Sequence, residues 1–238
     1  EYSTFLIPEA KLDELCRQAT FNGLQWGTRF QDLKISLYLV GGDDQERVEM
    51  AKRLESLVGP SLLVEGDVMP AQLLTDLLVA RGETISCAES CTSGFIAKLL
   101  TDQSGSSAWF YGGAVTYANE AKMAMLGVNE ETLQIHGAVS EACVLEMAEG
   151  MLNRSNTDWA LSVSGIAGPD GGSNEKPVGT VWFGFASKHR SSMAVKVQLT
   201  SYGRDSVRRK ASVVALILAS QYIKGACLLD TVKKWQYI

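Results

Sequence analysis

Hydrophobic positions follow two different spacings along the start of the chain. In residues 8–19, apolar side chains fall on one face of a helix that begins behind a proline. Residues 33–42 alternate apolar and polar side chains and end in a double glycine, as a half-buried strand does. Helical spacing returns in residues 43–59, and residues 61–66 can add a further strand. Residues 1–66 therefore predict a small two-layer α/β domain with the order helix, strand, strand, helix, strand.

Helical and strand patterns alternate through the rest of the chain, which is typical of a sheet covered by helices. We expect helices at residues 69–82, 92–102, 119–127, 140–155 and 204–223, and strands at residues 83–88, 107–117, 158–165, 178–187 and 193–200. The fold class predicted for residues 67–238 is thus one three-layer α/β domain with a mixed sheet. Its size lies within the usual range for a single domain.

Composition and charge narrow the function classes. The chain has 238 residues, 46% of them hydrophobic and 21% charged, as ordinary globular proteins do. A net charge of -5 argues against a general nucleic-acid or anionic-membrane binder, because such proteins need a basic surface. Nor do residues 21–34 supply a GxxG loop with basic flanks. We expect neither nucleic acid nor membrane as a partner, and a small anionic substrate remains open through local charge.

The cysteines and the chain start bear on the cellular setting. The five cysteines cannot all pair, and none forms a CxxC motif. Neither a signal peptide nor a long apolar span is recognisable, so a cytoplasmic location is expected. The chain begins at Glu1 without a methionine, from which we expect a piece of a longer protein. The cysteines are Cys16, Cys87, Cys91, Cys143 and Cys227.

The stretch CAESCTSG, residues 87–94, stands where a predicted strand passes into a predicted helix, a place where α/β folds carry chemistry. One interpretation is that Ser90 or Thr92 only caps the helix, as serine and threonine commonly do. The other is that Ser90 is a nucleophile and that N–H groups at the helix start hold an oxyanion. The second interpretation requires a base for the Ser90 hydroxyl.

Histidine does not supply that base in an obvious way. His136 is expected in a loop and His189 in a polar turn, so a Ser–His–Asp triad is not indicated. Lys98 lies about two helical turns beyond Ser90, about 12 Å along the axis, which is too far for direct proton transfer. We expect Lys98 to be a solvated surface lysine.

Lys122 is the better candidate, because it follows another strand end at the same edge of the sheet. A desolvated lysine, or one close to other cationic groups, loses its proton near neutral pH and can accept one from a serine. Tyr117, at that strand end, can donate a hydrogen bond to a developing oxyanion. The plainer interpretation, a surface lysine on a helix, stays open on this pattern alone.

Two further stretches suit a ligand. Residues 162–180 hold five glycines after an apolar strand, which would let the backbone approach a ligand, although a long hairpin explains them equally well. Arg204 begins a predicted helix, where a guanidinium and the helix dipole can share one phosphate. Arg208 and Arg209 lie further along that helix and are expected to be solvated.

Five segments together resemble one known family. AESCTSG, GSSAWFYGGAVTYANEAK, HGAVSE, SGIAGPDGGSNEKPVGTVWF and GRDSVRRKA are similar, in continuous order over residues 70–223, to the C-terminal domain of the CinA family, the nicotinamide-nucleotide amidohydrolases. Residues 1–66 resemble, mainly by their position, the KH-like middle domain of full-length members. Those members carry a further domain upstream, which we expect to be missing from this chain.

The resemblance implies an enzyme that hydrolyses the carboxamide of nicotinamide mononucleotide to nicotinate mononucleotide and ammonia. It places the nucleophile at Ser90, the lysine base at Lys122, a catalytic tyrosine at Tyr117 and a substrate-binding arginine at Arg204. It also implies a homodimer and no cofactor or metal. The other residues expected to bind substrate are Thr92, Ser164, Gly165 and Gly168.

The sequence departs from the family pattern at one position, and two other functions stay open. Ser93 stands where the family pattern has a glycine, which would weaken substrate binding if that position needs a positive φ. One alternative is a non-catalytic nucleotide-binding or regulatory module of the same fold. The other is a thiol amidase that uses Cys91 or Cys87. Ammonia release from nicotinamide mononucleotide separates the first from an enzyme, and iodoacetamide sensitivity separates a thiol from a serine nucleophile.

Overall fold

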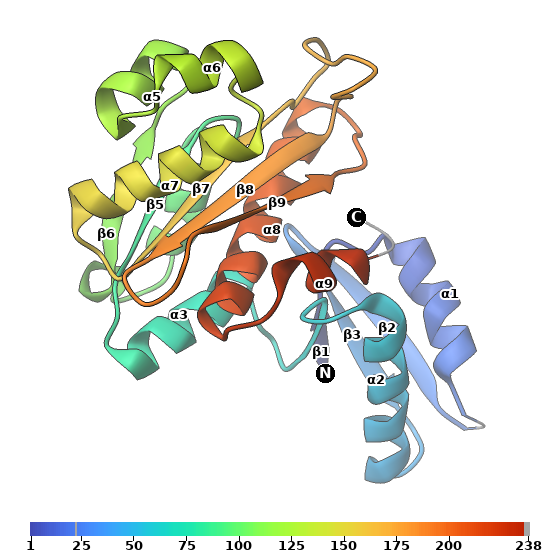
Figure 1. The fold of residues 1–238 in the computed structure, drawn as a ribbon. Helices are drawn as coiled ribbons and strands as arrows, with labels where there is room; N and C mark the ends of the chain where they lie inside the picture. The colour runs from blue at the N-terminus through green and yellow to red at the C-terminus, as the bar shows by residue number, and fades with distance from the viewer. Residues whose placement is uncertain (22, 236–238) are drawn as a thin grey trace. The chain divides into compact units, whose positions relative to one another are not determined.

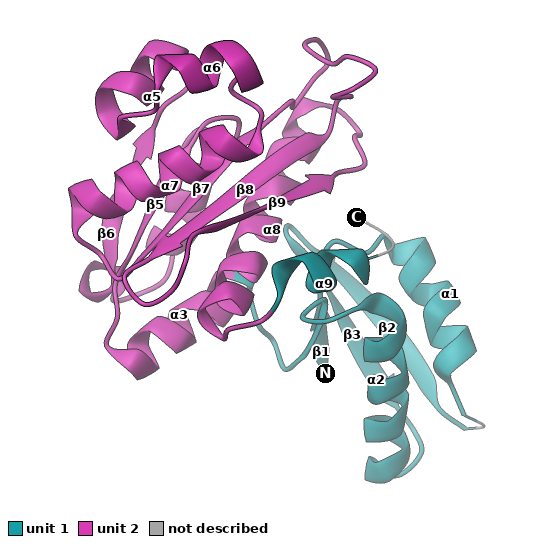
Figure 2. Cartoon of the chain, in the orientation of Figure 1, with its two compact units in different colours: residues 1–70, 227–238 teal, residues 71–226 magenta. Residues whose placement is uncertain are grey.

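The computed structural model describes residues 1–21 and 23–235, which form two compact units (Figures 1 and 2). The first unit comprises Glu1–Pro70 together with Cys227–Ile238, and the second comprises Ala71–Ala226. The sequence pattern had left the C-terminal segment with the second domain. That segment groups with the first unit because Trp235 packs there, its indole Nε1 donating to the Pro60 carbonyl at 3.1 Å.

A four-stranded antiparallel sheet with the order β2-β3-β1-β4 forms the first unit. Helices α1 and α2 pack against each other, and a capping box of Asp43 and Glu46 begins α2. Strand β1 and helix α9 were not predicted. The elements are β1 (Tyr2–Thr4), α1 (Glu9–Ala19), β2 (Gln25–Gln31), β3 (Lys34–Val40), α2 (Asp44–Val58), β4 (Leu63–Glu65) and α9 (Leu228–Lys233).

The second unit is built on a mixed five-stranded sheet with the order β6-β5-β7-β8-β9. Strand β5 runs parallel to β6 and β7, whereas β8 and β9 are antiparallel to their neighbours. The predicted α/β class with a mixed sheet is therefore confirmed. The strands are β5 (Ile85–Glu89), β6 (Phe110–Val115), β7 (Trp159–Gly165), β8 (Thr180–Ser187) and β9 (Met193–Gln198).

Helices cover both faces of this sheet, with α7 in front and α8 behind in Figure 1. Ala88, Ala160 and Ala186 pack with the buried side of α7 in one core cluster. Trp159 and Phe185, one residue away along their strands, point to the opposite face. There both rings meet Tyr222 of α8, with centroids 5.6 Å and 5.5 Å away.

The helices of the second unit match the predicted ones, with local differences. Helix α6 was not predicted. We had expected His136 in a loop, but it is the last residue of this helix. Residues 106–108 form a turn of 3₁₀ helix and the strand begins only at Phe110. The helices are α3 (Pro70–Arg81), α4 (Phe95–Thr101), α5 (Asn119–Leu126), α6 (Glu130–His136), α7 (Glu141–Ser155) and α8 (Arg204–Ile223).

Candidate active site

The candidate site lies at one edge of the mixed sheet, where three neighbouring strands end. Ser90 directly follows β5, Tyr117 comes two residues after β6, and Ser164 and Gly165 close β7. Because β5 is parallel to both neighbours, these three carboxyl ends meet at the same edge. The alternation of strands and helices in the sequence thus brings together side chains that are far apart in the chain.

Ser90 and Lys122 are in contact at this edge. The Lys122 Nζ lies 3.3 Å from the Ser90 Oγ, and it donates to the carbonyls of Thr116 at 2.8 Å and Tyr117 at 3.1 Å. A neutral amine has two N–H donors and one lone pair. With both N–H groups held by the two carbonyls, the lone pair is left for the Ser90 hydroxyl proton. Lys122 is thus placed to act as a base, and it is not a surface lysine.

Burial favours the neutral form of Lys122. Its side chain is fully buried, and the loss of hydration lowers its pKa below the ordinary 10.5 of lysine. The neighbouring Cys143, Cys91 and Glu120 act in the opposite direction and only partly offset this effect. Of the two causes considered for a lowered pKa of Lys122, desolvation therefore acts here, and no cation among the described residues contributes.

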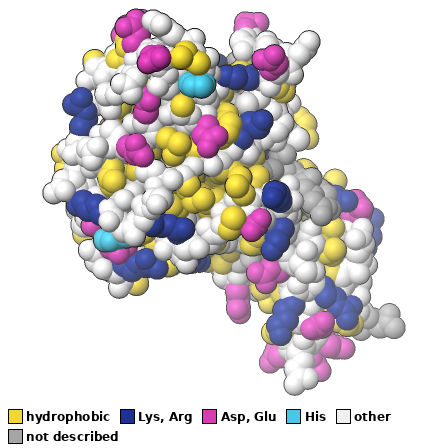
Figure 3. Space-filling model, in the orientation of Figure 1, with side chains coloured by type: hydrophobic (Ala, Val, Ile, Leu, Met, Phe, Trp, Pro, Cys, Tyr) yellow, Lys and Arg dark blue, Asp and Glu magenta, His cyan; other side chains and the backbone are white. Residues whose placement is uncertain are grey.

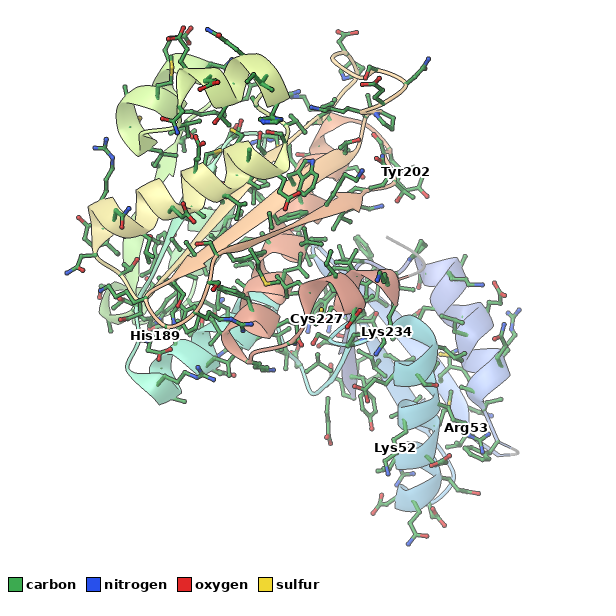
Figure 4. The ribbon with its side chains drawn as sticks, viewed as in Figure 1. Lys52, Arg53, His189, Tyr202, Cys227 and Lys234 are labelled. Carbon is green, nitrogen blue, oxygen red and sulfur yellow. The ribbon has the colours of Figure 1, made fainter. Side chains whose placement is uncertain are left out.

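Arg204 and Tyr117 form the outer part of the site. Arg204, the first residue of α8, donates from Nη2 to the Tyr117 hydroxyl at 2.7 Å and from Nη1 to the Gly168 carbonyl at 3.0 Å. Tyr202, labelled in Figure 4, precedes it by two residues and is exposed. The guanidinium is exposed to solvent at this point, so it offers a positive charge beside the buried serine and lysine.

A cavity of about 180 Å³ connects these residues. Of the eight residues predicted for the site, six line it, and they come from five separate stretches of chain. Thr92 and Gly168 are not among the described residues that line it: the Thr92 side chain is fully buried, and Gly168 contributes the carbonyl bound by Arg204. The six are Ser90, Tyr117, Lys122, Ser164, Gly165 and Arg204.

Gly165 and Ser164 shape the wall of this cavity. A Cβ atom at Gly165 would lie 2.7 Å from Val181 Cγ2 and 2.9 Å from the Thr180 carbonyl, so a side chain there would collide with β8. The Ser164 hydroxyl donates to the Ala138 carbonyl at 2.7 Å, which ties the segment before α7 to the end of β7. Gly165 therefore allows β8 to lie close to the end of β7, and Ser164 fixes the neighbouring segment of the cavity wall.

Glu89 is a site-forming residue that the sequence analysis missed. Its buried carboxylate accepts from the backbone N–H groups of Gly94 at 2.9 Å, Ile96 at 3.2 Å and Ala97 at 2.9 Å. It therefore caps α4, a role that we had considered for Ser90 or Thr92. It also occupies helix-start N–H groups that we had expected to hold an oxyanion.

Arg208 is the second residue that the sequence analysis missed. We expected it to be solvated, but its Nε donates to the Cys91 carbonyl and its Nη2 to the Thr92 carbonyl, both at 3.2 Å. These carbonyls belong to the turn directly after Ser90. No local pattern could reveal this contact, because the partners are backbone atoms 116 and 117 residues away.

The thiols near the site are poorly suited to attack. Burial raises the pKa of Cys91 to about 12, and it raises that of Cys87 well above its ordinary value. Glu89 raises both further through its negative charge. Because the thiolate is the nucleophilic form, these shifts disfavour a thiol amidase and leave Ser90 as the nucleophile the environment favours.

Ser93 takes the conformation that favours glycine. Its φ is 51°, in the left-handed region, and its hydroxyl donates to the Ser90 carbonyl at 3.2 Å. Gly94, which follows, also has a positive φ of 89°. The position held by glycine in the family pattern therefore does need a positive φ, and Ser93 adopts it with a local hydrogen bond that supports the turn.

The histidines lie away from this site. His189, labelled in Figure 4, has its Nε2 3.9 Å from Glu83 Oε1 and 3.8 Å from Asp158 Oδ1. These carboxylates come just before β5 and β7, at the amino ends of the strands, whereas Ser90 lies at the carboxyl end of β5. His136 ends α6 and is not among the described residues around the cavity that holds Ser90.

Residues 1–21 and 23–235 contain no group of three or more histidine, cysteine, aspartate or glutamate side chains that could hold a metal ion. Over the same residues, no helix has the length and apolar character needed to cross a bilayer. On the face drawn in Figure 3, basic side chains of the described residues are interspersed with acidic ones.

Known proteins are similar to this chain over the second unit. A family model described as the CinA C-terminal domain matches residues 69–223. Nicotinamide-nucleotide amidohydrolase PncC of Escherichia coli K12 is 59% identical over 139 residues, which cover 58% of this chain and 84% of that protein. A putative competence-damage inducible protein of Thermoanaerobacter pseudethanolicus is 36% identical over 230 residues, or 93% of this chain and 55% of that protein.

Solved structures show the same fold. The crystal structure of a CinA superfamily protein from Klebsiella pneumoniae superposes with a TM-score of 0.62 at 36% sequence identity. The match covers 66% of this chain and 96% of that one.

Proposed function

Because this chain belongs to the CinA C-terminal domain family, we propose that it hydrolyses the carboxamide of nicotinamide mononucleotide to nicotinate mononucleotide and ammonia, in pyridine-nucleotide recycling. The observation that carries the proposal is the buried Lys122 amine 3.3 Å from the Ser90 hydroxyl. A serine beside a desolvated base is the arrangement that acyl transfer requires. The name and 59% identity of the Escherichia coli relative support the substrate.

The first half of the reaction forms an acyl-enzyme. Ser90 Oγ attacks the carboxamide carbon while its proton passes to the Lys122 amine. The lysine then gives this proton to the departing nitrogen as the C–N bond breaks, and ammonia leaves. The product of this half is an ester between Ser90 and the nicotinoyl group, with Lys122 again neutral.

The second half regenerates the enzyme. Water replaces ammonia, loses a proton to Lys122 and attacks the ester carbon. The ester bond breaks, the proton returns to Ser90 Oγ, and the nicotinate group is released as a carboxylate after losing its own proton to solvent. The net reaction consumes one water for each amide, and no cofactor or metal enters the balance.

Arg204 and Tyr117 are placed to hold the nucleotide end of the substrate. The exposed guanidinium provides a charge for the phosphate, and its position at the start of the 20-residue α8 adds the favourable end of the helix dipole. Tyr117 contacts both groups, because its hydroxyl accepts from the same guanidinium and its backbone carbonyl accepts from Lys122. We propose Tyr117 as a substrate-orienting or oxyanion-stabilising group.

The proposal is tested by ammonia release from nicotinamide mononucleotide, with Ser90→Ala and the exposed-serine control Ser107→Ala. Ser90→Ala should lose at least about four orders of magnitude in kcat while keeping the wild-type melting temperature, and Ser107→Ala should keep full activity. Turnover should resist iodoacetamide. Binding of nicotinamide mononucleotide without ammonia release by the wild type would establish the non-catalytic alternative, and full activity in Ser90→Ala would refute the assigned nucleophile.

A further inference from the structure

Arg208 holds the turn that follows Ser90. It lies one helical turn beyond Arg204 on α8, and its guanidinium donates to two successive carbonyls, those of Cys91 and Thr92, each at 3.2 Å. No ion pair among the described residues includes Arg208. Its positive charge is therefore directed at the backbone dipoles of this turn and at no carboxylate.

Because the peptide bond is planar, this contact also fixes the direction of the N–H group in the same peptide. In a trans peptide the C=O and the N–H that share one plane point in opposite directions. Since the Cys91 carbonyl points to the guanidinium, the Thr92 N–H points away from it. The described residues that line the cavity include Cys91 but not Arg208. The arginine therefore binds the turn from outside the cavity.

Most other N–H groups of this segment already have acceptors. The Ser90 N–H donates to the Val163 carbonyl at 2.9 Å, and the Ser93 N–H donates to the Ser90 carbonyl at 3.2 Å. Gly94, Ile96 and Ala97 donate to Glu89. The Cys91 N–H lies against its own thiol, whereas the Thr92 N–H has no acceptor within the described part of the chain.

We propose that Arg208 is a positioning residue for the reaction at Ser90, which directs the unpaired Thr92 N–H toward the oxyanion that forms on the substrate. The proposal rests on the proposed acyl transfer at Ser90. An N–H held in place before the reaction stabilises developing negative charge without reorganisation. A cation bound to the carbonyl of the same peptide also polarises its N–H and strengthens that hydrogen bond.

The proposal also gives Thr92 a role through its backbone. The side-chain hydroxyl of Thr92 is fully buried and, among the described residues, has no hydrogen-bond partner. Its peptide N–H, however, belongs to the plane that Arg208 orients. The expected contact between Thr92 and the substrate would therefore be made by its backbone.

The test compares Arg208→Met, which keeps the length of the side chain but not its donors, with Arg208→Lys, which keeps the charge and part of the donor capacity. Arg209→Met is the control, because Arg209 is the neighbouring arginine and pairs with Asp205 on the helix surface at 2.6 Å. Steady-state kinetics with nicotinamide mononucleotide and melting temperatures are measured for all four proteins. A second readout, the rate at which a small phosphonofluoridate labels Ser90, followed by mass spectrometry, needs no nucleotide substrate.

For Arg208→Met we expect kcat to fall about 30- to 300-fold with KM within threefold, because removal of one oxyanion donor costs about 10²–10³ in kcat. The labelling rate should fall in parallel, Arg208→Lys should recover at least tenfold of the loss, and Arg209→Met should match the wild type. A rise in KM at constant kcat, or a lower melting temperature with unchanged kcat and labelling, would overturn the proposal.

The two proposals fail in different ways. A wild type that labels at Ser90 but releases no ammonia from nicotinamide mononucleotide would refute the proposed substrate, and the labelling rates of the Arg208 variants would still decide the positioning role. Equal labelling of wild type and Arg208→Met would refute that role even if the wild type hydrolyses nicotinamide mononucleotide.

Discussion

Arg204 donates a 2.7 Å hydrogen bond to the hydroxyl of Tyr117, although the two residues are 87 positions apart in the chain. The other terminal nitrogen of the same guanidinium is bound to the Gly168 carbonyl at 3.0 Å. Two bonds of this kind fix the plane of a guanidinium, so the charge is directed before any ligand arrives. A group held in this way loses little further freedom when it binds a phosphate.

The first prediction concerns the phosphate. Arg204→Ala should raise KM for nicotinamide mononucleotide about 10- to 100-fold, because one charge-assisted contact is worth about 1.5–3 kcal/mol. Any reaction on unphosphorylated nicotinamide riboside should change less than threefold. Steady-state kinetics on both substrates provide the measurement, with Arg209→Ala as the control. Equal losses on both substrates would contradict a phosphate role for Arg204.

The second prediction concerns pH. Burial lowers the pKa of Lys122, and only the neutral amine can accept the Ser90 proton. Since deprotonation increases as pH rises, kcat/KM should increase with pH and level off below the ordinary lysine value of 10.5. Lys122→Met should lose both activity and this ascending limb. A Lys122→Met enzyme that kept the wild-type profile would require another base.

That Ser90 and Lys122 lie at one sheet edge could be expected from the sequence, although the pattern alone left a helix cap and a surface lysine open, whereas the contacts of Glu89 and Arg208 could not be expected. The first two stand at junctions between strand and helix, which apolar periodicity reveals, and the order of such junctions in a parallel sheet brings them to one edge. Glu89 and Arg208 act on backbone N–H and C=O groups, which every residue carries and no sequence pattern distinguishes. The short elements β1, α6 and α9 also escaped prediction, although β4 and α4, with three and seven residues, did not.

The third prediction concerns Glu89, whose two carboxylate oxygens accept three backbone N–H groups at the start of α4. Glu89→Gln should reduce the free energy of unfolding by about 2–3 kcal/mol, because hydrogen bonds to a charged group and the helix-dipole interaction are weakened. Urea unfolding followed by circular dichroism provides the measurement, with the exposed Glu120→Gln as control. A change below about 0.5 kcal/mol would show that the cap contributes little.

The last prediction concerns the boundary between the two units. Every candidate site residue lies in Ala71–Ala226, so a shortened chain of residues 68–226 should fold and keep amidase activity within about threefold of the full chain. A chain of residues 68–238 should be less soluble, because it would expose the Leu228 and Trp235 side chains, which are 0% and 6% exposed in the full chain. Light scattering and ammonia release on both chains, prepared in parallel, provide the measurement. A folded but inactive 68–226 chain would show that the first unit completes the active site.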